Sequence, residues 1–322
     1  MEYTDVFICE EKDKDPSNSI WNYLNKPVIK PNFFIVGAPK CGTTAMNDYL
    51  HQHPDIFMAR KEVHYFGKDL KTKMKLSESD YLKNFQDAGN KKIIGEASVW
   101  YLFSETAAEE IKKFAPHAKI LIMLRNPAEV IHSLHSQHLF DGNEDVFDFE
   151  TALNLDDERK KGINLPHSVD FSELPPYKDA VLFSGQVKRY FNVFAKENVH
   201  VILYDDFIAN TKKTVSDTLK FLGVNEQEKI DYVIINPNKR IKWFYLHRMI
   251  KNPSVRLKRM MRLVLPVRKL RHFIMFYLFK WNIKTERREE MGVNLQTRLR
   301  KFLAGDINLL SKIINRDLSN WL

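Results

Sequence analysis

Residues 33 to 44 combine side chains and backbone that suit the binding of a phosphate group. The segment reads Phe-Phe-Ile-Val-Gly-Ala-Pro-Lys-Cys-Gly-Thr-Thr, a short apolar run, a glycine turn and the start of a helical pattern. A strand that passes through such a turn into a helix directs backbone N–H groups and the helix dipole at a bound anion. The predicted phosphate-binding residues are Gly37, Pro39, Lys40, Cys41, Gly42, Thr43 and Thr44.

The place of the lysine separates this turn from the loops that bind nucleoside triphosphates. Those loops read G-x-x-x-x-G-K-[ST], with the lysine directly after the second glycine. Here Thr43 follows Gly42, and Lys40 lies earlier, inside the turn. The sequence therefore predicts a phosphate site that is not the standard ATP or GTP loop. A turn of an α/β protein with incidental glycines is the alternative.

A second phosphate site is predicted where an arginine ends the apolar run 118–124. Arg125 follows this run, and Ser133 lies eight residues later in a segment with a helical pattern. An arginine offers a charge-assisted pair of donors to a phosphate, and a serine adds one hydroxyl donor. A structural ion pair is the other common role of an arginine at a strand end, and the residues alone leave both roles open.

These two segments resemble the binding sites of sulfotransferases that use 3′-phosphoadenosine 5′-phosphosulfate (PAPS) as donor. The turn with its early lysine is similar to their 5′-phosphosulfate-binding loop, and Leu124-Arg125-Asn126-Pro127 with Ser133 is similar to their 3′-phosphate-binding segment. The sequence departs from the family at Val130, where many relatives have a second arginine. Further similar blocks lie at 61–66, 95–98, 204–207 and 221–224, so the resemblance covers roughly residues 32 to 224.

The resemblance implies transfer of a sulfuryl group from PAPS to a hydroxyl or amine, with adenosine 3′,5′-bisphosphate (PAP) as product and no metal. It assigns Lys40 as the cation that stabilises the leaving phosphate. Glu62 is the implied base, with His64 as its orienting partner or as an alternative base. A carboxyl group in a closed, partly apolar pocket has a raised pKa, which suits this task. A solvated Lys-Glu pair is the alternative at 61–62.

Three residues further along the chain join the donor site through the same resemblance. Tyr204 lies in the block 204–207, and Lys239 and Arg240 open a basic stretch where the family has a loop over the 3′-phosphate. We expect these two cations to replace the charge that is missing at Val130. We expect the segment 140–178 to form a wall of the site that binds the acceptor, although its residues do not identify the substrate.

These residues need a scaffold, and strands alternate with helices along the chain. The apolar and periodic patterns predict strands at 33–36, 92–95, 118–124 and 199–204, and helices at 43–50, 104–114, 128–139, 177–194 and 211–222. Such alternation gives a parallel sheet covered on both faces, with ligands at the carboxyl ends of its strands. We therefore predict an α/β fold, a P-loop-type parallel sheet flanked by helices. The expected divisions are an irregular lead-in (1–31), the sulfotransferase domain (32–240) and a basic helical C-terminal extension (241–322) packed on or beside it.

The basic residues are concentrated in one part of the chain. The formal net charge is +9, yet residues 232 to 285 contain 14 Lys and Arg and no Asp or Glu, and subtracting these 14 leaves −5 elsewhere. A local excess of this kind indicates an anionic partner. One helical face in this region carries Leu270, Phe273, Ile274, Tyr277, Leu278 and Trp281. This stripe predicts a helix that packs on the sheet, with a basic amphipathic helix on a membrane surface as the alternative.

The cysteines and the N-terminal sequence show no disulfide framework, metal cluster or targeting signal. Cys9 and Cys41 provide neither a disulfide framework nor a metal cluster. The acidic N-terminus lacks the basic and apolar parts of a secretory signal, and no apolar run approaches the about 20 residues of a membrane span. We therefore expect a soluble, cytoplasmic protein.

Two further sets of residues are expected to be structural. His132, His135 and His138 recur at every third position and fan across a helix, whereas a metal site needs converging ligands. The acidic runs 109–110 and 156–158 are expected to be solvated helix faces.

Two other functions agree with parts of the sequence. A P-loop kinase or nucleotide hydrolase would explain the phosphate turn but needs a lysine after Gly42. A non-enzymatic protein that binds nucleic acid or a membrane through residues 232–285 would explain the basic stretch. We favour the sulfotransferase, with a carbohydrate, a lipid or a small molecule as acceptor, no nucleic-acid partner, and peripheral membrane contact through the basic C-terminal region.

Overall fold

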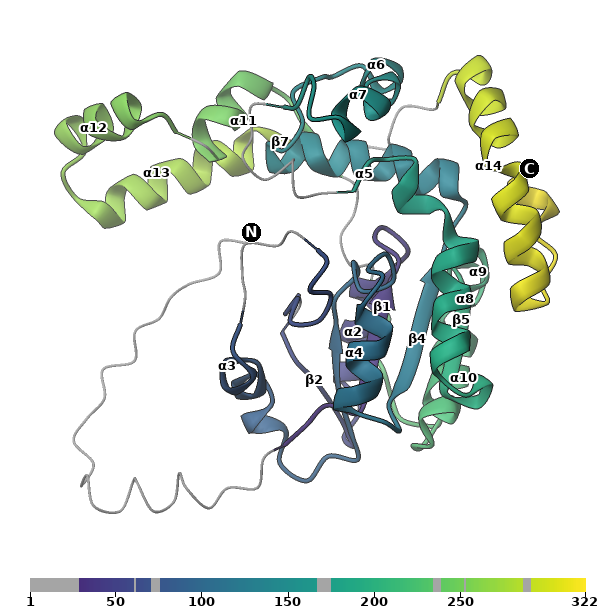
Figure 1. Ribbon diagram of the computed structural model, residues 1–322. Coiled ribbons are helices and arrows are strands. Elements are labelled where there is room, and N and C mark those ends of the chain that lie inside the picture. Colours follow the sequence, from purple (N-terminus) through teal and green to yellow (C-terminus); the bar gives the residue numbers. More distant parts are fainter. Residues whose placement is uncertain are drawn as a thin grey trace, which may run out of the picture.

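A five-stranded parallel sheet forms the centre of the computed structural model, which describes residues 29–60, 62–70, 76–166, 175–233, 239–251, 253–285 and 291–322 (Figure 1). The strands are β1 (Phe33–Gly37), β2 (Ile56–Met58), β3 (Ile93–Ala97), β4 (Lys119–Leu124) and β5 (Val199–Leu203). Their order across the sheet is β2-β3-β1-β4-β5, and neighbouring strands are parallel. The predicted α/β fold is confirmed.

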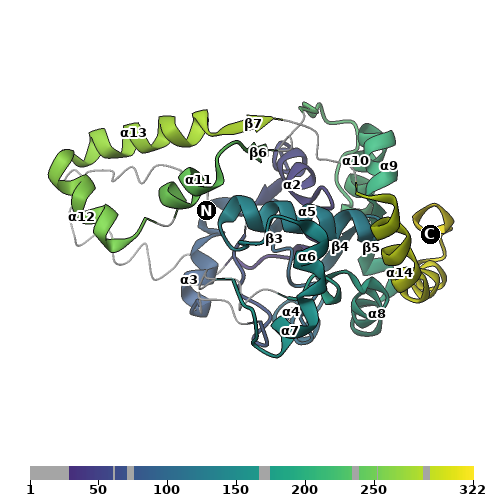
Figure 2. The same cartoon turned by 90° about the horizontal axis from the view of Figure 1, so that it is seen from above.

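Helices cover both faces of this sheet. Seen from above in Figure 2, α2 (Thr43–His51) and α10 (Thr211–Leu222) lie on one side, and α4 (Ala107–Phe114) and α8 (Phe183–Val193) lie on the other. Helix α5 (Pro127–Asp141) crosses the upper end of the sheet in Figure 1. The shorter elements are α3 (Glu78–Lys83), α6 (Phe149–Asn154), α7 (Asp156–Lys160), α9 (Tyr204–Ala209) and the 3-10 turns η1 (Gln86–Ala88), η3 (Asp179–Val181), η4 (Lys196–Asn198) and η5 (Ser319–Trp321).

The sequences of the strands reflect this double cover. All residues of β1 are buried, as are all residues of β4 after Lys119. Strands that are covered on both faces read as continuous apolar runs, which is why β1 and β4 are visible in the sequence. Strand β3 differs because it carries Glu96, whose side chain is fully buried. A buried carboxyl group requires hydrogen-bond donors, and these lie in the candidate active site.

Beyond the sheet, the chain divides into an arm and a packed helix. The arm (residues 239–285) contains the antiparallel strands β6 (Lys239–Ile241) and β7 (Ile283–Thr285), and the helices α11 (Phe244–Lys251), α12 (Val255–Val264) and α13 (Arg268–Trp281). Both views show α12 and α13 as a hairpin that projects from the remainder of the described chain, which we call the body (Figures 1 and 2). Helix α14 (Val293–Ile314) returns to the body and packs against α8.

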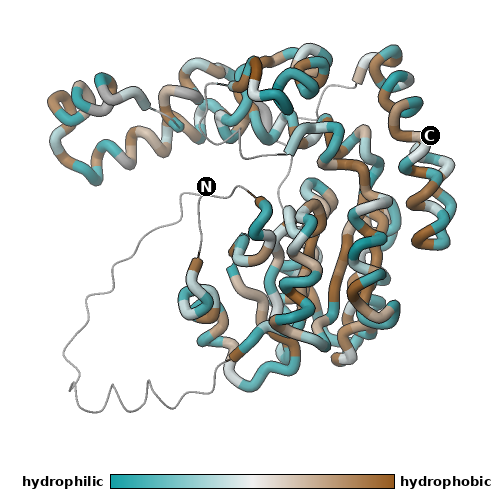
Figure 3. Tube along the Cα trace, viewed as in Figure 1, coloured by the Kyte–Doolittle hydropathy of each residue, from teal (hydrophilic) through white to brown (hydrophobic). Residues whose placement is uncertain are grey.

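The stripe at 270–281 does not pack on the sheet, so that prediction is wrong. Leu270, Phe273, Tyr277 and Trp281 are exposed, and Figure 3 shows hydrophobic positions along the arm at a distance from the sheet. The spacing correctly predicts an amphipathic helix. However, β6 packs on α5 and the β6–β7 pair leads the arm outward.

Several element boundaries also differ from the predicted ones. Tyr204 begins α9 instead of ending β5, because β5 stops at Leu203. Helix α8 begins at Phe183, since the segment that starts at Tyr177 first forms the 3-10 turn η3. Strand β2 has three residues and was not predicted, because so short an edge strand has no clear alternation.

Candidate active site

The ends of the five parallel strands bring the predicted site residues to one edge of the sheet. Each strand is followed directly by part of the site, because the carboxyl ends of parallel strands meet at the same edge. The predicted residues are Lys40 after β1, Glu62 and His64 after β2, Arg125 after β4 and Tyr204 after β5. Ser98, which was not predicted as a site residue, follows β3. Segments that are far apart in the sequence thus form one candidate site.

The phosphate turn depends on its glycines. Gly42 has a φ of +87° and precedes α2, and Lys40 also has a positive φ, of +64°. A Cβ atom on Gly42 would approach the ring of Phe207 to 3.1 Å and that of Tyr204 to 3.3 Å. The α9 side chains therefore close against the turn, and a side chain at position 42 would be strained by both backbone and packing.

The side chain of Lys40 points to α5. Its Nζ donates a hydrogen bond to Oε1 of Gln137 at 3.0 Å, and Gln137 Nε2 donates to Oδ2 of Asp141 at 2.7 Å. Gln137 was not predicted as a partner, because it lies 97 residues from Lys40 and belongs to no motif. This contact connects the phosphate turn to α5.

Cys41 is a packing residue inside the turn. Its side chain is fully buried, and its Sγ lies 3.4 Å from the carbonyl oxygen of Pro39. Burial raises the pKa of the thiol to about 12, although the charges of Arg125 and Lys40 act in the opposite direction. Cys41 is therefore a protonated thiol at neutral pH, and two cations from different strands lie close enough to act on it.

Arg125 forms an ion pair, which is one of the two roles that the sequence left open for a strand-end arginine. Its Nε donates to Oε2 of Glu129 at 2.8 Å, and its guanidinium lies 4.5 Å from the ring centre of Tyr204. Ser133 is buried on the same helix as Glu129. Val130 is fully buried in the hydrophobic core, so the position that carries arginine in many relatives faces apolar neighbours here.

The two candidate bases form a pair. Nε2 of His64 lies 2.8 Å from Oε2 of Glu62, and both side chains are partly buried. His64 has a positive φ of +52°. Its other ring nitrogen, Nδ1, is buried and has no hydrogen-bond partner within the described residues. The pair lies on the loop after β2, as a base at the sheet edge requires.

The buried carboxyl group of Glu96 supports the loop that carries the Glu62–His64 pair. Glu96 accepts hydrogen bonds from the hydroxyls of Tyr81 at 2.6 Å and Ser98 at 2.8 Å, and burial raises its pKa. The Ser98 hydroxyl in turn accepts from the backbone N–H groups of Val63 and His64, each at 3.1 Å. One serine thus connects the buried carboxyl group to the backbone that carries the Glu62–His64 pair.

Tyr101 makes a second connection of the same kind. Its hydroxyl lies 3.3 Å from Glu96 and accepts from the backbone N–H groups of Tyr65 at 2.8 Å and Phe66 at 3.2 Å. The sequence resemblance named the block 95–98 but gave no function to Glu96, Tyr81 or Tyr101. A polar residue within an otherwise buried strand was the available signal.

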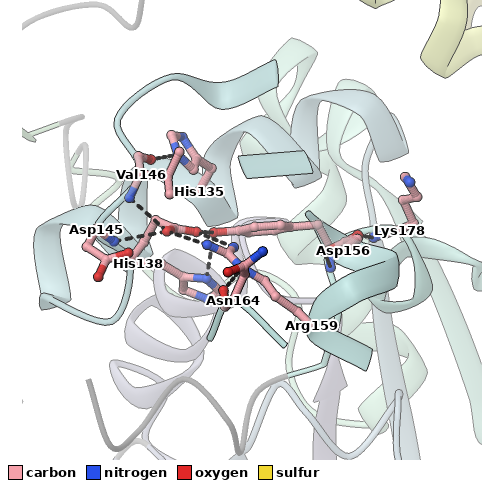
Figure 4. A network of polar contacts seen from close by, with 10 residues as sticks. His135, His138, Asp145, Val146, Asp156, Arg159, Asn164 and Lys178 are labelled. Carbon is pink, nitrogen blue, oxygen red and sulfur yellow. Dashed lines mark hydrogen bonds and ion pairs between the residues drawn. The ribbon is translucent and has the colours of Figure 1, made fainter. Parts of the chain in front are cut away.

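A separate buried network stabilises the segment after α5 (Figure 4). Arg159 Nη1 and Nη2 form a bidentate ion pair with Glu144, at 2.7 and 2.9 Å. The hydroxyl of Tyr177 also donates to Glu144, at 2.9 Å. Asp156 is fully buried and accepts from the backbone N–H groups of Tyr177 and Lys178. The expectation of a solvated face at 156–158 is therefore wrong for Asp156, because these N–H groups replace water around its carboxylate.

Two of the three helix-face histidines, His135 and His138, belong to this network. Nε2 of His135 lies 2.8 Å from the carbonyl oxygen of Val146, and Nδ1 of His138 lies 3.2 Å from the hydroxyl of Tyr177. Burial lowers the pKa of both residues, that of His138 to about 4. His132 stacks on Phe149. Within the described residues, no group of three or more His, Cys, Asp or Glu side chains is arranged to hold a metal ion.

Two predictions concern residues that lie partly or mostly outside the described part of the chain. The backbone of Lys239 and Arg240 begins β6, but their side chains lie outside the described part of the chain. Most of the predicted lead-in (1–31) lies outside it as well. Among the described helices, none is both long and apolar enough to cross a bilayer.

Comparison with known proteins places most of the chain in one family. The family model for the sulfotransferase domain matches residues 30–262. Carbohydrate sulfotransferase 15 of Mus musculus is 28% identical over 248 residues, which cover 60% of this chain and 44% of that protein. The membrane-associated sulfotransferase kil1 of Dictyostelium discoideum is 22% identical over 319 residues, which cover 76% of this chain and 66% of that protein. The chain thus spans less than half the length of the carbohydrate sulfotransferase.

One solved structure matches this chain over nearly the whole length of both proteins. The sulfotransferase from Alicyclobacillus acidocaldarius is 30% identical, with a TM-score of 0.67, and the match covers 91% of this chain and 99% of that one. The parallel sheet and the helices around it therefore have a relative of known structure.

Proposed function

The chain belongs to the sulfotransferase domain family, and from this premise we propose that it transfers a sulfuryl group from PAPS to an acceptor hydroxyl or amine. The observation that carries the proposal is the common edge of the sheet. There the Lys40 turn, the Arg125–Ser133 segment and the Glu62–His64 pair all follow strand ends. The reaction needs two anion sites and one base, and this arrangement supports the assignment of these residues to them.

The donor fits the two anion sites. The turn and the start of α2 provide the N–H groups of Thr43 and Thr44 for the 5′-phosphosulfate, together with Lys40. Arg125 and Ser133 provide the charge and the hydroxyl for the 3′-phosphate, and Tyr204 borders the guanidinium. The present ion pair of Arg125 is no obstacle: its partner carboxylate is half exposed, and exposed pairs contribute at most about 1 kcal/mol.

The chemistry is an in-line displacement at sulfur. Glu62 accepts the proton of the acceptor hydroxyl while the acceptor oxygen forms a bond to sulfur. The bond between sulfur and the bridging phosphate oxygen breaks, and PAP leaves with that electron pair. Lys40 stabilises the charge that develops on the departing oxygen. The position of His64, 2.8 Å from Glu62, suits it to orient that carboxylate, and it is the alternative base.

Lys239 and Arg240 remain proposed as residues that bind the donor PAPS. We propose that they supply the charge that the buried Val130 does not. The double variant Lys239→Ala/Arg240→Ala should weaken PAPS binding, and donor affinity equal to that of the natural protein would reject this role. The domain limits 1–31, 32–240 and 241–322 and the cytoplasmic location also remain predictions.

A glycan is the proposed acceptor class. Several relatives are named as carbohydrate or heparan sulfate sulfotransferases, and the acceptor hydroxyl of a sugar suits a carboxylate base. A lipid head group and a small alcohol are the other acceptors to be compared. The segment 140–178, whose described part the Glu144–Arg159 pair organises, is the proposed acceptor wall.

The proposal is tested with radiolabelled PAPS and panels of glycans, lipids and small alcohols. We expect label to appear in at least one glycan, and the rate to fall by roughly 100-fold or more in Glu62→Gln. The exposed Glu109 provides the matched control, since Glu109→Gln should retain full activity. Binding of PAP without transfer to any acceptor class would reject the enzymatic function, and full activity of Glu62→Gln would reject Glu62 as the base.

A further inference from the structure

The tip of the α12–α13 hairpin carries apolar side chains that are more than half exposed. Leu263 is 84% exposed and Val264 72% exposed at the end of α12, and Val267 in the connection is 58% exposed. The exposed apolar surface continues along α13 through Leu270, Phe273, Phe276, Tyr277, Leu278 and Trp281. Contiguous apolar surface of this kind on a protein indicates a binding site, whereas isolated exposed apolar residues do not.

The same hairpin is strongly cationic. Its exposed basic residues include Arg256, Arg259, Arg262, Arg268, Lys269 and Lys280. The sequence from 232 to 285 contains no Asp or Glu, so no carboxylate within the arm offsets these charges. Arg262 and Arg268 lie on either side of the apolar tip in the sequence. Exposed aliphatic and aromatic residues next to arginine and lysine are the composition of helices that lie at a membrane interface.

The base of the arm is fixed to the body at the active-site edge. Nε2 of the buried His247 lies 2.6 Å from the carbonyl oxygen of Phe140 in α5. Lys251 forms an ion pair with Asp141 at the end of the same helix, at 3.4 Å. The buried Asn282 bonds both the N–H and the carbonyl oxygen of Trp243, at 2.8 and 2.9 Å. The arm is thus held at its base while its tip projects (Figure 1).

We propose that α12 and α13 dock on the surface of a membrane that contains anionic lipids. A bilayer offers negative charge and apolar depth together, as the arm requires. Glycans and nucleic acids offer charge but no partner for exposed Leu and Val side chains. A second copy of the chain would bring like charges together, because both arms lack carboxylates from 232 to 285. Charge complementarity therefore selects the anionic membrane.

The experiment is co-sedimentation of the full chain with vesicles. Vesicles of phosphatidylcholine with phosphatidylglycerol should bind the protein, vesicles of phosphatidylcholine alone should bind it at least about tenfold more weakly, and high salt should release it. The variant Leu263→Ser/Val264→Ser/Val267→Ser should lose at least about tenfold in affinity. Exposed apolar residues outside the arm provide the control, and Ile208→Ser/Val293→Ser should bind like the natural protein.

The charges are tested in the same way. The variant Arg256→Gln/Arg259→Gln/Arg262→Gln should also lose at least about tenfold, whereas Lys212→Gln/Lys220→Gln/Lys301→Gln, with exposed lysines of the body, should lose much less. Equal binding to both vesicle types, or unchanged binding of either arm variant, would overturn the proposal. So would sedimentation as a dimer that the apolar-tip variant alone converts to monomer, since the occupant would then be a second copy. Binding of PAP is measured on every variant to show that the body is folded.

Discussion

Helices α13 and α14 have similar amphipathic patterns and opposite surroundings. In α14, Leu295, Leu299, Leu303, Ile307 and Leu310 repeat at three- and four-residue steps, and all are buried. In α13, the stripe from Leu270 to Trp281 has the same helical spacing, and its residues are exposed except for the half-buried Ile274. Periodicity therefore predicts that a helix is amphipathic, but it does not predict what covers the apolar face.

The polar residues of α14 and of the arm help to explain why α14 is packed on the body and α13 is not. Asp306 of α14 accepts a hydrogen bond from the backbone N–H of Ser184 in α8, at 3.2 Å, and so ties the helix to the body. The arm has no carboxylate to make such a tie. Body and arm should therefore respond differently to substitution: changes in the body should affect catalysis or stability, and changes in the arm should affect membrane binding.

The largest effect is expected at the sheet edge of the body. Lys40→Ala should lower the rate of sulfuryl transfer by about a thousandfold, because it removes the cation that stabilises the departing oxygen. Unfolding temperature should remain close to that of the natural protein. The exposed Lys113→Ala is the control. Near-normal transfer by Lys40→Ala would show that Lys40 has no part in the mechanism. Loss of transfer to soluble acceptors in the arm variants would contradict the separate functions of body and arm.

A matched pair of leucines tests the comparison of the two helices directly. Leu303 is 1% exposed in α14, and Leu270 is 46% exposed in α13. Leu303→Ala should lower the free energy of unfolding by about 3 kcal/mol, whereas Leu270→Ala should lower it by less than about 0.5 kcal/mol. Urea denaturation measures both. Similar losses would mean that the α13 stripe is buried in solution.

Buried histidines give the body a pH dependence. Burial lowers the pKa of His138 from 6.5 to about 4, so between these values the unfolded chain binds a proton that the folded chain does not. This stability is therefore present above about pH 6.5 and is lost as the pH falls toward 4, by about 1.4 kcal/mol per pH unit. Between about pH 7.5 and about pH 5 the natural protein should lose about 2 kcal/mol from this residue.

Urea unfolding at the two pH values measures the effect. The variant His138→Gln should lose correspondingly less stability on acidification, and the exposed His117→Gln should behave like the natural protein. The same acid-induced loss in His138→Gln as in the natural protein would contradict the assignment.

The smallest effect tests how the body positions its base. Ser98 and Tyr81 each donate to Glu96, but only Ser98 also accepts from the backbone of Val63 and His64. Ser98→Ala should lower kcat by about tenfold with little change in the KM for PAPS, because it releases that backbone. Tyr81→Phe should change kcat by less than about threefold. Equal effects would show that the network supports only stability.

Much of the site was predictable because it follows strand ends. The strands at 33–36, 118–124 and 199–204 are nearly continuous apolar runs, so Lys40 and Arg125 were placed correctly at the sheet edge. Contacts between distant segments were not predictable. Gln137, Tyr81 and Tyr101 have no local pattern, and their functions depend on packing across many residues. Asp156 was misjudged for the same reason, since its partners lie 21 and 22 residues away.

The most direct test of the central claim is a comparison of ligands by thermal unfolding of the full chain. PAP and ATP with Mg²⁺ both contain adenosine and phosphates, but only PAP carries the 3′-phosphate that Arg125 and Ser133 are proposed to bind. PAP should raise the unfolding temperature more than ATP with Mg²⁺ does, and Arg125→Ala should remove most of that rise. An equal or larger rise with ATP and Mg²⁺ would contradict the assignment of the sheet edge to a sulfotransferase donor.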